Sequence, residues 1–243
     1  MNSLVSSDPV LHQRLTALED RRLQVLGDTL DKLVISIDEV PNVALRAWRD
    51  SGHGRVIVGI GGFPASGKTS LAKKMTASIN SGHGGILAAH LPMDGFHFRN
   101  SVLNAEGNQD IKGDLVTYDL RRFVEKLAEF QGEPFASMTA PDYIRLEHEV
   151  CDDVIAIGEE VRILIVEGIY VGYSEGVWDQ ARMLFDPLIY LDVVPAVCAK
   201  RIVSRNLEAG RDRQLIRRKL GNDFGFMERG LTILPNADYV VRP

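Results

Sequence analysis

The chain has 243 residues, of which 45% are hydrophobic, and its formal net charge at pH 7 is -5. This length is enough for one large hydrophobic core with a small appendage, so a single α/β domain is the default expectation. The negative net charge excludes a surface coated with basic residues for nonspecific nucleic-acid binding, although it leaves room for a local basic pocket.

Neither secretion nor membrane insertion is expected. The first ten residues lack the basic start and the apolar stretch of a signal peptide, and no apolar run approaches the length of a membrane span. The two cysteines, Cys151 and Cys198, have neither metal-ligand nor redox spacing. We therefore predict that they are reduced thiols of a cytoplasmic protein.

The N-terminal region, residues 1–50, is predicted to be a helical extension. Apolar side chains recur at three- and four-residue steps within 8–50, at Leu11, Leu15, Leu18, Val25, Leu26, Leu30 and Leu33. Gly27 is expected to interrupt this helix, and the polar segment 50–54 is expected to end the extension. The spacing suits extra cover for a sheet or the surface of a homodimer, and both roles stay open.

The remainder of the chain, residues 51–243, alternates apolar runs with helical patterns. The strand candidates are the runs at 56–60, 86–89, 163–166, 188–191 and 239–241. This alternation favours a mainly parallel five-stranded sheet in a three-layer α/β/α arrangement. A helix at 119–131, with Asp119 as its N-cap, and β-like stretches at 135–157 predict a substrate-binding excursion over 119–157.

Residues 62–69 spell Gly-x-x-x-x-Gly-Lys-Thr, directly after the strand at 56–60 and directly before a predicted helix at 68–79. Glycines let the backbone N–H groups curl toward a phosphate, and the helix N-terminus adds partial positive charge. We estimate the probability of a chance match in such a chain at below about one in a hundred. The predicted nucleotide-binding residues of this P-loop are Gly62, Phe63, Pro64, Ala65, Ser66, Gly67, Lys68, Thr69 and Ser70.

Three of these side chains have expected roles. Lys68 would reach the β- and γ-phosphates, Thr69 would offer its hydroxyl to Mg²⁺, and Ser70 would contact a further phosphate oxygen. GTPase switches, motor ATPases and transporters share such a loop. The chain contains neither the Asn-Lys-x-Asp motif that reads guanine nor the Leu-Ser-Gly-Gly-Gln motif of transporters. Among these classes of P-loop protein, the sequence therefore favours a kinase.

A carboxylate follows the second apolar run. Asp94 lies in the segment 92–97, at the edge where open α/β sheets bind ligands. Phosphoryl transfer to an alcohol needs a carboxylate that orients the hydroxyl and accepts its proton, so Asp94 is the predicted base. An Asp-Gly turn without function is the alternative. His97 is either a substrate contact or a structural hydrogen-bonding residue.

Several segments together resemble the family of phosphoribulokinase, uridine kinase and pantothenate kinase. In chain order they are 62–70, 93–97, 112–113 with 117–119, 166–170 and the arginine-rich stretch 201–211. The sequence Met-Asp-Gly-Phe-His at 93–97 and the Lys-Gly pair at 112–113 are most similar to the family's branch of sugar kinases, described as fructose kinases. The resemblance covers roughly 55–243 and leaves the N-terminal extension outside.

The resemblance implies roles for residues that match the family's motifs. Asp94 matches the catalytic aspartate, and Glu167 matches a glutamate near the metal, where it would either hold Mg²⁺ through water, together with Thr69, or help position the acceptor. With Lys68 and Arg205, these two carboxylates form the expected catalytic set. A lid at 196–220 would close over the nucleotide, bringing Arg201, Arg205 and Arg211 to its phosphates, because guanidinium groups bind phosphate bidentately.

The segment around Pro141 matches the part of the family that lines the acceptor pocket. The expected substrate-binding residues are Asp94, His97, Tyr143, Arg145 and His148. Ile144 stands where the sugar-kinase branch usually has aspartate, and this departure leaves the identity of the acceptor open.

The sequence therefore predicts a kinase that uses ATP and Mg²⁺ to phosphorylate a hydroxyl of a small metabolite, with a sugar such as fructose as the first candidate. A uridine or other nucleoside kinase and a pantothenate kinase are the alternatives within enzymes. A nucleotide-binding regulatory protein without transfer activity is the alternative from another class. Neither a nucleic acid nor a membrane is expected as a partner.

Overall fold

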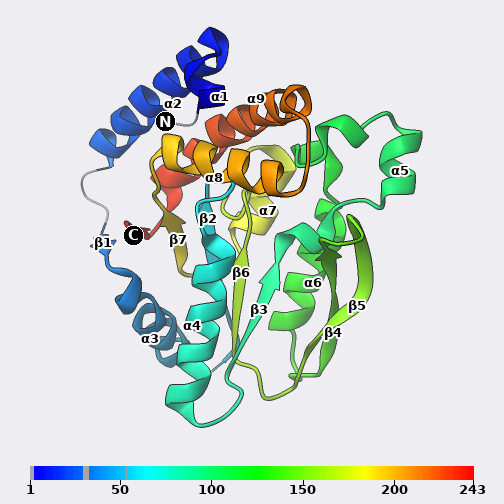
Figure 1. Cartoon of the computed structure of the whole chain (residues 1–243). Helices are drawn as coiled ribbons and strands as arrows, with labels where there is room; N and C mark the ends of the chain where they lie inside the picture. Colours follow the sequence, from blue (N-terminus) through cyan, green and yellow to red (C-terminus); the bar gives the residue numbers. More distant parts are fainter. Residues whose placement is uncertain (1–2, 30–32, 53) are drawn as a thin grey trace.

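A six-stranded parallel sheet forms the centre of the molecule (Figure 1). The computed structural model describes residues 3–29, 33–52 and 54–243. The strands lie in the order β1-β8-β7-β2-β6-β3, and every neighbouring pair is parallel. Their bounds are β1 Leu33–Ile35, β2 Val56–Gly62, β3 Ala88–Pro92, β6 Ile163–Glu167, β7 Leu188–Leu191 and β8 Tyr239–Val241. All five predicted strands are present, and the three-layer α/β fold is confirmed.

The sixth strand, β1, comes from the N-terminal extension, so the prediction of helix throughout 8–50 is wrong at this point. Val34 and Ile35 pair with Val240 and Val241 of β8, about two hundred residues later in the sequence. Because β1 and β8 are so far apart in the sequence, no short-range pattern near residues 33–35 indicates that the two strands pair. The helix before β1, α2 (Pro9–Asp28), also passes through Gly27 and ends one residue later, so the glycine does not interrupt it.

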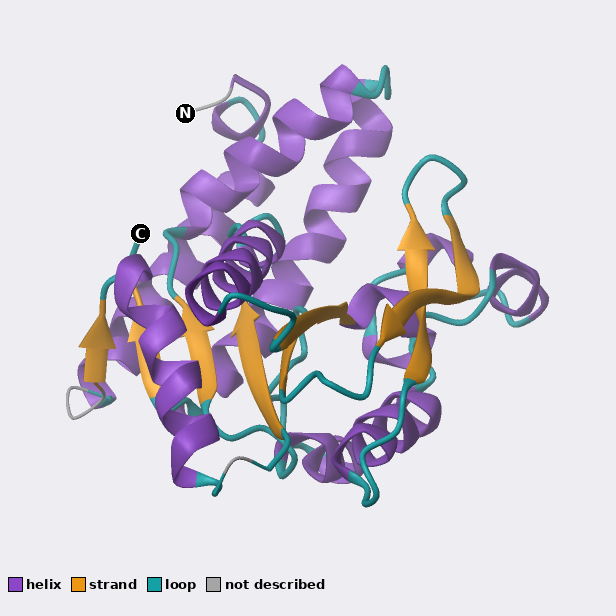
Figure 2. Ribbon diagram, turned by 90° about the horizontal axis from the view of Figure 1, so that it is seen from below, coloured by secondary structure: helices purple, strands orange, loops and turns teal. Residues whose placement is uncertain are grey.

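Helices cover both faces of the sheet (Figure 2). Because successive side chains of a strand point to opposite faces, Val58 joins the hydrophobic cluster on one face and Ile57 joins the cluster on the other. The first cluster includes α2, α3 (Val40–Asp50), α4 (Lys68–His83), α8 (Pro195–Glu208) and α9 (Arg213–Gly230). The second includes α6 (Leu120–Gln131), α7 (Asp179–Arg182) and the 3₁₀ segment η6 (Leu231–Asn236). The remaining short segments are α1 (Ser3–Ser6), α5 (Asn100–Ala105), η1 (Ile37–Glu39), η2 (Met93–Phe96), η3 (Gln109–Ile111), η4 (Leu115–Thr117) and η5 (Gly176–Trp178).

A buried ion pair fixes the N-terminal extension to the sheet. Arg22 of α2 donates from Nε and Nη2 to the two oxygens of Asp192, just after β7, at 2.6 and 2.9 Å. Arg22 is 7% exposed and Asp192 is 3% exposed, and Arg242 adds a third contact to this carboxylate at 3.2 Å. The extension thus covers the helices of one face, whereas its predicted use as a homodimer surface stays a prediction.

Replacing Arg22 by methionine should lower the free energy of unfolding by about 2–4 kcal/mol, because Asp192 would keep only its contact with the more exposed Arg242. Urea denaturation measures the difference. Arg121→Met is the matched control, since Arg121 is largely exposed beside Glu125 and such surface pairs contribute less than about 1 kcal/mol. Equal midpoints for the two variants would contradict the assigned role of Arg22.

A separate hairpin stands beside the sheet, where the sequence predicts a β-like excursion. Strands β4 (Met138–Ile144) and β5 (Glu149–Ile157) pair antiparallel, and β4 packs against η2. A Cβ on Gly95 of η2 would lie 2.4 Å from the carbonyl oxygen of Pro141, so only glycine permits this approach. The close contact places the hairpin next to Asp94. None of the helices within the described residues is long and apolar enough to cross a membrane.

Candidate active site

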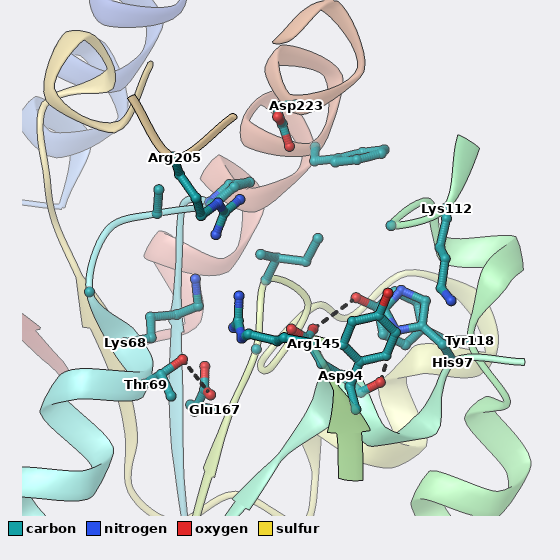
Figure 3. Close-up of a pocket in the computed structure, with 18 of the residues that line it drawn as sticks. Lys68, Thr69, Asp94, His97, Lys112, Tyr118, Arg145, Glu167, Arg205 and Asp223 are labelled. Carbon is teal, nitrogen blue, oxygen red and sulfur yellow. Dashed lines mark hydrogen bonds between the residues drawn. The ribbon is translucent and has the colours of Figure 1, made fainter. Parts of the chain in front are cut away.

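A cavity of about 370 Å³ opens at the carboxyl ends of β2, β3 and β6. Side chains from several separate parts of the chain converge on it (Figure 3). Lys68, Thr69 and Glu167 lie on one side, Asp94 and His97 on the other, and α8 and α9 form its upper wall in this view. This is the edge of the sheet where parallel α/β folds bind their ligands.

The P-loop joins β2 to α4, as the motif predicts. Gly62 has a φ of 145° and a Cβ there would lie 2.7 Å from the carbonyl oxygen of Leu191, while Gly67 has a φ of 109° at the N-cap of α4. Both positions therefore require glycine. The predicted loop residues that line the cavity are Pro64, Ala65, Gly67, Lys68, Thr69 and Ser70. Phe63 instead packs in the core against Tyr190, and Ser66 is buried behind the loop.

The Lys68 ammonium is held at the mouth of the loop. Its Nζ donates to the carbonyl oxygens of Gly62 and Phe63 at 3.0 and 2.8 Å. Burial lowers the pKa of Lys68, and the carboxylates of Glu167 and Asp94 act in the opposite direction. A cation held here without a direct carboxylate contact is ready to bind the anionic phosphates of a nucleotide.

Thr69 and Glu167 form the predicted metal-side pair. The Thr69 hydroxyl donates to Oε1 of Glu167 at 2.8 Å, and Nε2 of His90 lies 3.5 Å from the same oxygen. Burial alone would raise the pKa of Glu167, but His90, Lys68 and Thr69 together lower it, so the carboxylate is ionised at neutral pH.

These oxygens fit Mg²⁺. This ion prefers oxygen ligands, and in phosphoryl-transfer sites it is bound by one or two carboxylates together with waters and substrate phosphates. In the described part of the chain no group of three or more His, Cys, Asp or Glu side chains could hold a metal by itself.

Asp94 lies in η2, directly after β3, and points into the cavity (Figure 3). The Tyr118 hydroxyl donates to its Oδ1 at 3.4 Å, and burial raises the pKa of Tyr118 well above its ordinary value, so this phenol stays a donor. His97 donates from Nδ1 to the backbone oxygen of Asp94 at 2.9 Å. Burial lowers the pKa of His97 despite the opposing charge of Asp94, so the imidazole is neutral. The carboxylate is thus oriented and free to accept a proton.

The acceptor-side residues fall into two groups. Tyr143 and Arg145, at the end of β4, line the cavity as the resemblance predicts, together with Lys112. His148 lies exposed in the hairpin turn with a φ of 52° and does not line this cavity. Lys112 and Tyr118 belong to motifs that carry the family resemblance, and this was the signal that could have assigned them to the site.

The three lid arginines have different positions. Arg205 of α8 lines the cavity beside Lys68 (Figure 3). Arg201 donates from Nη1 to the carbonyl oxygens of Ala65 and Ser66 at 3.1 and 2.9 Å, so it braces the P-loop from outside. Arg211 donates to Oδ1 of Asn206 at 2.5 Å at the α8–α9 turn and does not line the cavity.

Asp223 and Phe226 of α9 also line the cavity, and no motif predicts them. Burial raises the pKa of Asp223 to about 7, although Arg205 and Lys219 act against this shift. A folded-state pKa above the ordinary value of 3.8 means that the folded protein binds the extra proton between these two pH values. Stability should therefore fall as the pH rises from about 4 to about 7.

Asp223→Asn should remove this pH dependence. We expect the variant to unfold with the same free energy as the parent protein near pH 4 and to be more stable by about 1–3 kcal/mol at pH 8, after allowance for the partial exposure of the carboxyl. Urea denaturation of the ligand-free protein across pH 4–8 measures the difference. Asp110→Asn, at an exposed carboxylate, should stay parallel to the parent protein. A parallel curve for Asp223→Asn as well would contradict the assigned pKa.

Comparison with known proteins gives a consistent result. Residues 57–220 match the model of the phosphoribulokinase/uridine kinase family. A Schizosaccharomyces pombe protein described as a candidate uridine kinase is 30% identical over 73% of this chain and 76% of its own length. A pantothenate kinase of Vibrio cholerae is 32% identical over 47% of this chain but only 36% of its own length.

Among solved structures, a candidate fructose transport system kinase from Silicibacter sp. TM1040 is similar with a TM-score of 0.76. It is 26% identical, and the similarity covers 85% of this chain and 98% of that one. The matched region 57–220 contains the P-loop, Asp94, Glu167 and the lid arginines. The chain therefore belongs to the phosphoribulokinase/uridine kinase family and is an ATP-dependent phosphotransferase that acts on a hydroxyl group.

Proposed function

We propose that the protein transfers the γ-phosphate of Mg-ATP to a hydroxyl of a small metabolite, with a sugar or sugar derivative as the acceptor. The observation that supports this most is the position of Asp94 across one cavity from the P-loop lysine, Lys68 (Figure 3). A nucleotide phosphate at the loop and a hydroxyl at Asp94 would then meet inside that cavity.

The side chains divide the work between the two substrates. Lys68 and Arg205 would bind the phosphates and stabilise the charge that develops during transfer. Asp94, oriented by Tyr118, would hold the acceptor hydroxyl and take its proton as the oxygen attacks phosphorus. Thr69 and Glu167 would hold Mg²⁺, which neutralises phosphate charge when it is bound. Closure of α8 and α9 over the cavity would exclude water.

Three acceptor types have relatives in support. The similar solved structure is described as a candidate fructose transport system kinase, and the similarity covers 98% of that chain, which favours a sugar. The relatives described as a uridine kinase and a pantothenate kinase keep those acceptors as alternatives. A cytoplasmic location and a homodimer stay predictions from the sequence alone.

An ADP-release assay with Mg-ATP tests the proposal. The panel contains fructose, other sugars and their phosphate esters, uridine, cytidine, pantothenate and glycerate. A kinase releases ADP only when an acceptor is added, and the phosphorylated product is then identified by mass spectrometry. ADP release that is independent of every acceptor, or ATP binding without turnover across the panel, would instead favour a nucleotide-binding regulatory protein.

A further inference from the structure

The acceptor side of the cavity keeps two cations that the transfer reaction does not use. Lys68 and Arg205 lie on the P-loop side of the cavity, Lys112 lies beyond Asp94, and the Arg145 side chain extends between Asp94 and Glu167 in this view (Figure 3). Asp94 is needed for the acceptor hydroxyl. Neither Lys112 nor Arg145 forms an ion pair within the described residues, so these two charges require a separate explanation.

Lys112 is a half-buried ammonium with neutral partners. Its Nζ donates to Oδ1 of Asn100 at 2.7 Å and to the carbonyl oxygen of His148 at 3.3 Å, and it lies 4.7 Å from the centre of the Tyr143 ring. An ammonium has three N–H donors, so one is left for a ligand in the cavity. Burial lowers the pKa of Lys112, although the charges of Glu149 and Asp94 act in the opposite direction.

Arg145 enters the cavity from the hairpin. It is the first residue of the turn after β4 and lies two residues after Tyr143. Within the described residues Arg145 takes part in no hydrogen bond or ion pair, and it lines both the main cavity and an adjoining one of about 320 Å³. Burial and the nearby Asp94 raise the pKa of Tyr143, whereas Arg145 acts in the opposite direction, which places its charge close to that ring.

The neighbouring acids form no ion pair with these two cations within the described residues. Asp142 accepts the N–H of Tyr143 at 2.7 Å, and Glu149 accepts the N–H groups of Asn100 and Val150. Among the described residues, neither carboxylate lies within ion-pair distance of Lys112 or Arg145. The adjoining cavity is lined by Lys73 as well as by the acids Asp94, Asp142 and Glu167. An acceptor that carries its own negative charge would give Lys112 and Arg145 an ion-pair partner, and a neutral one would not.

We propose that the phosphate acceptor carries an oxyanion, a carboxylate or a phosphate, which Lys112 and Arg145 bind while Asp94 holds the reacting hydroxyl. The inference rests on the proposed kinase function and narrows its substrate class. Free fructose would then be a poorer acceptor than an anionic sugar derivative or hydroxy acid. An oxyanion held by these cations would fix one end of the acceptor, and this would orient the hydroxyl at the other end.

Matched acceptor pairs test the inference. Fructose and fructose 6-phosphate differ by a phosphate, whereas glycerol and glycerate, or pantothenol and pantothenate, differ by a carboxylate. We expect the anionic member of a productive pair to have a kcat/KM at least about tenfold higher, and we expect added salt to reduce this preference. The pairs also distinguish a carboxylate from a phosphate, because the ratio of kcat/KM between the anionic and the neutral member should be larger for one of these two groups than for the other.

Variants connect the preference to the two cations. Arg145→Met should raise the KM for the anionic acceptor about 10–100-fold and leave that for its neutral partner unchanged, because a charged hydrogen bond is lost. Arg145 is exposed in a turn, so the replacement should not affect folding, and Arg145→Lys should restore part of the affinity. Lys112→Met should have a similar selectivity. Arg121→Met, at an exposed arginine of α6 outside the cavity, is the matched control.

The outcomes separate this inference from the proposed function. If a neutral acceptor is used as well as its anionic partner, or if Arg145→Met weakens both equally, the inference is overturned and the kinase function stands. If no acceptor stimulates ADP release, the proposed function fails. Calorimetric titration of each acceptor pair, in the presence of Mg²⁺ and a non-hydrolysable ATP analogue, then tests the inference separately. Tighter binding of the anionic member, lost in Arg145→Met, supports the inference. Equal binding of the two members, or no binding of either, overturns it.

Discussion

Replacing Asp94 by asparagine should lower kcat by about 10²–10⁴-fold, the usual contribution of a positioned general base. Asparagine keeps an oxygen that can accept the Tyr118 hydroxyl, so the turn after β3 should keep its conformation. What is lost is the capacity to take the proton of the acceptor hydroxyl. The KM for ATP should change little, because Asp94 lies across the cavity from the P-loop (Figure 3).

Steady-state kinetics with saturating acceptor measure this effect, and thermal denaturation checks that the variant folds. Asp110→Asn is the control, since Asp110 is an exposed carboxylate near Arg218 and does not line the cavity. A loss of less than about tenfold for Asp94→Asn would show that positioning and phosphate electrostatics suffice, and Asp94 would then lose its role as base.

The parts of the fold that could be predicted are those whose residue pattern lies within a short stretch of the sequence. Each of the five predicted strands is a continuous apolar run, which is typical of parallel strands buried on both faces. The P-loop was equally predictable, because its glycines are required by backbone geometry at Gly62 and Gly67. Glu167 is the last residue of β6 and Asp94 comes soon after the end of β3, so their meeting at one edge of the sheet follows from the parallel topology alone.

The parts that were not predictable depend on distant contacts. β1 is three residues long and is a strand because β8 lies beside it. Arg201 and Arg205 lie on one side of α8, and only the packing of that helix against the P-loop decides that Arg201 meets loop carbonyls while Arg205 faces the cavity. Asp223 enters the site because α9 folds back over the sheet, and no motif marks such a return.

Lys68→Met should lower kcat/KM for ATP by about 10³-fold, the second large effect that we expect. Methionine is similar in length and can fill the buried channel beside Gly62 and Phe63, but it removes the ammonium that these carbonyls hold at the mouth of the loop. In the transition state the negative charge spreads over the phosphoryl oxygens, so the loss should exceed that of a ground-state hydrogen bond and should affect kcat as well as KM.

The comparison with a lysine outside the cavity makes the Lys68 effect specific. Lys200 of α8 is exposed, so Lys200→Met removes one positive charge without touching the P-loop and should leave kcat/KM unchanged. Binding of a fluorescent ATP analogue separates the two steps, because Lys68→Met should bind it more weakly but still detectably through the loop N–H groups and Arg205. If kcat/KM falls less than tenfold, Arg205 and the helix N-terminus would carry the phosphate chemistry, and Lys68 would serve mainly to hold the loop through its two carbonyl contacts.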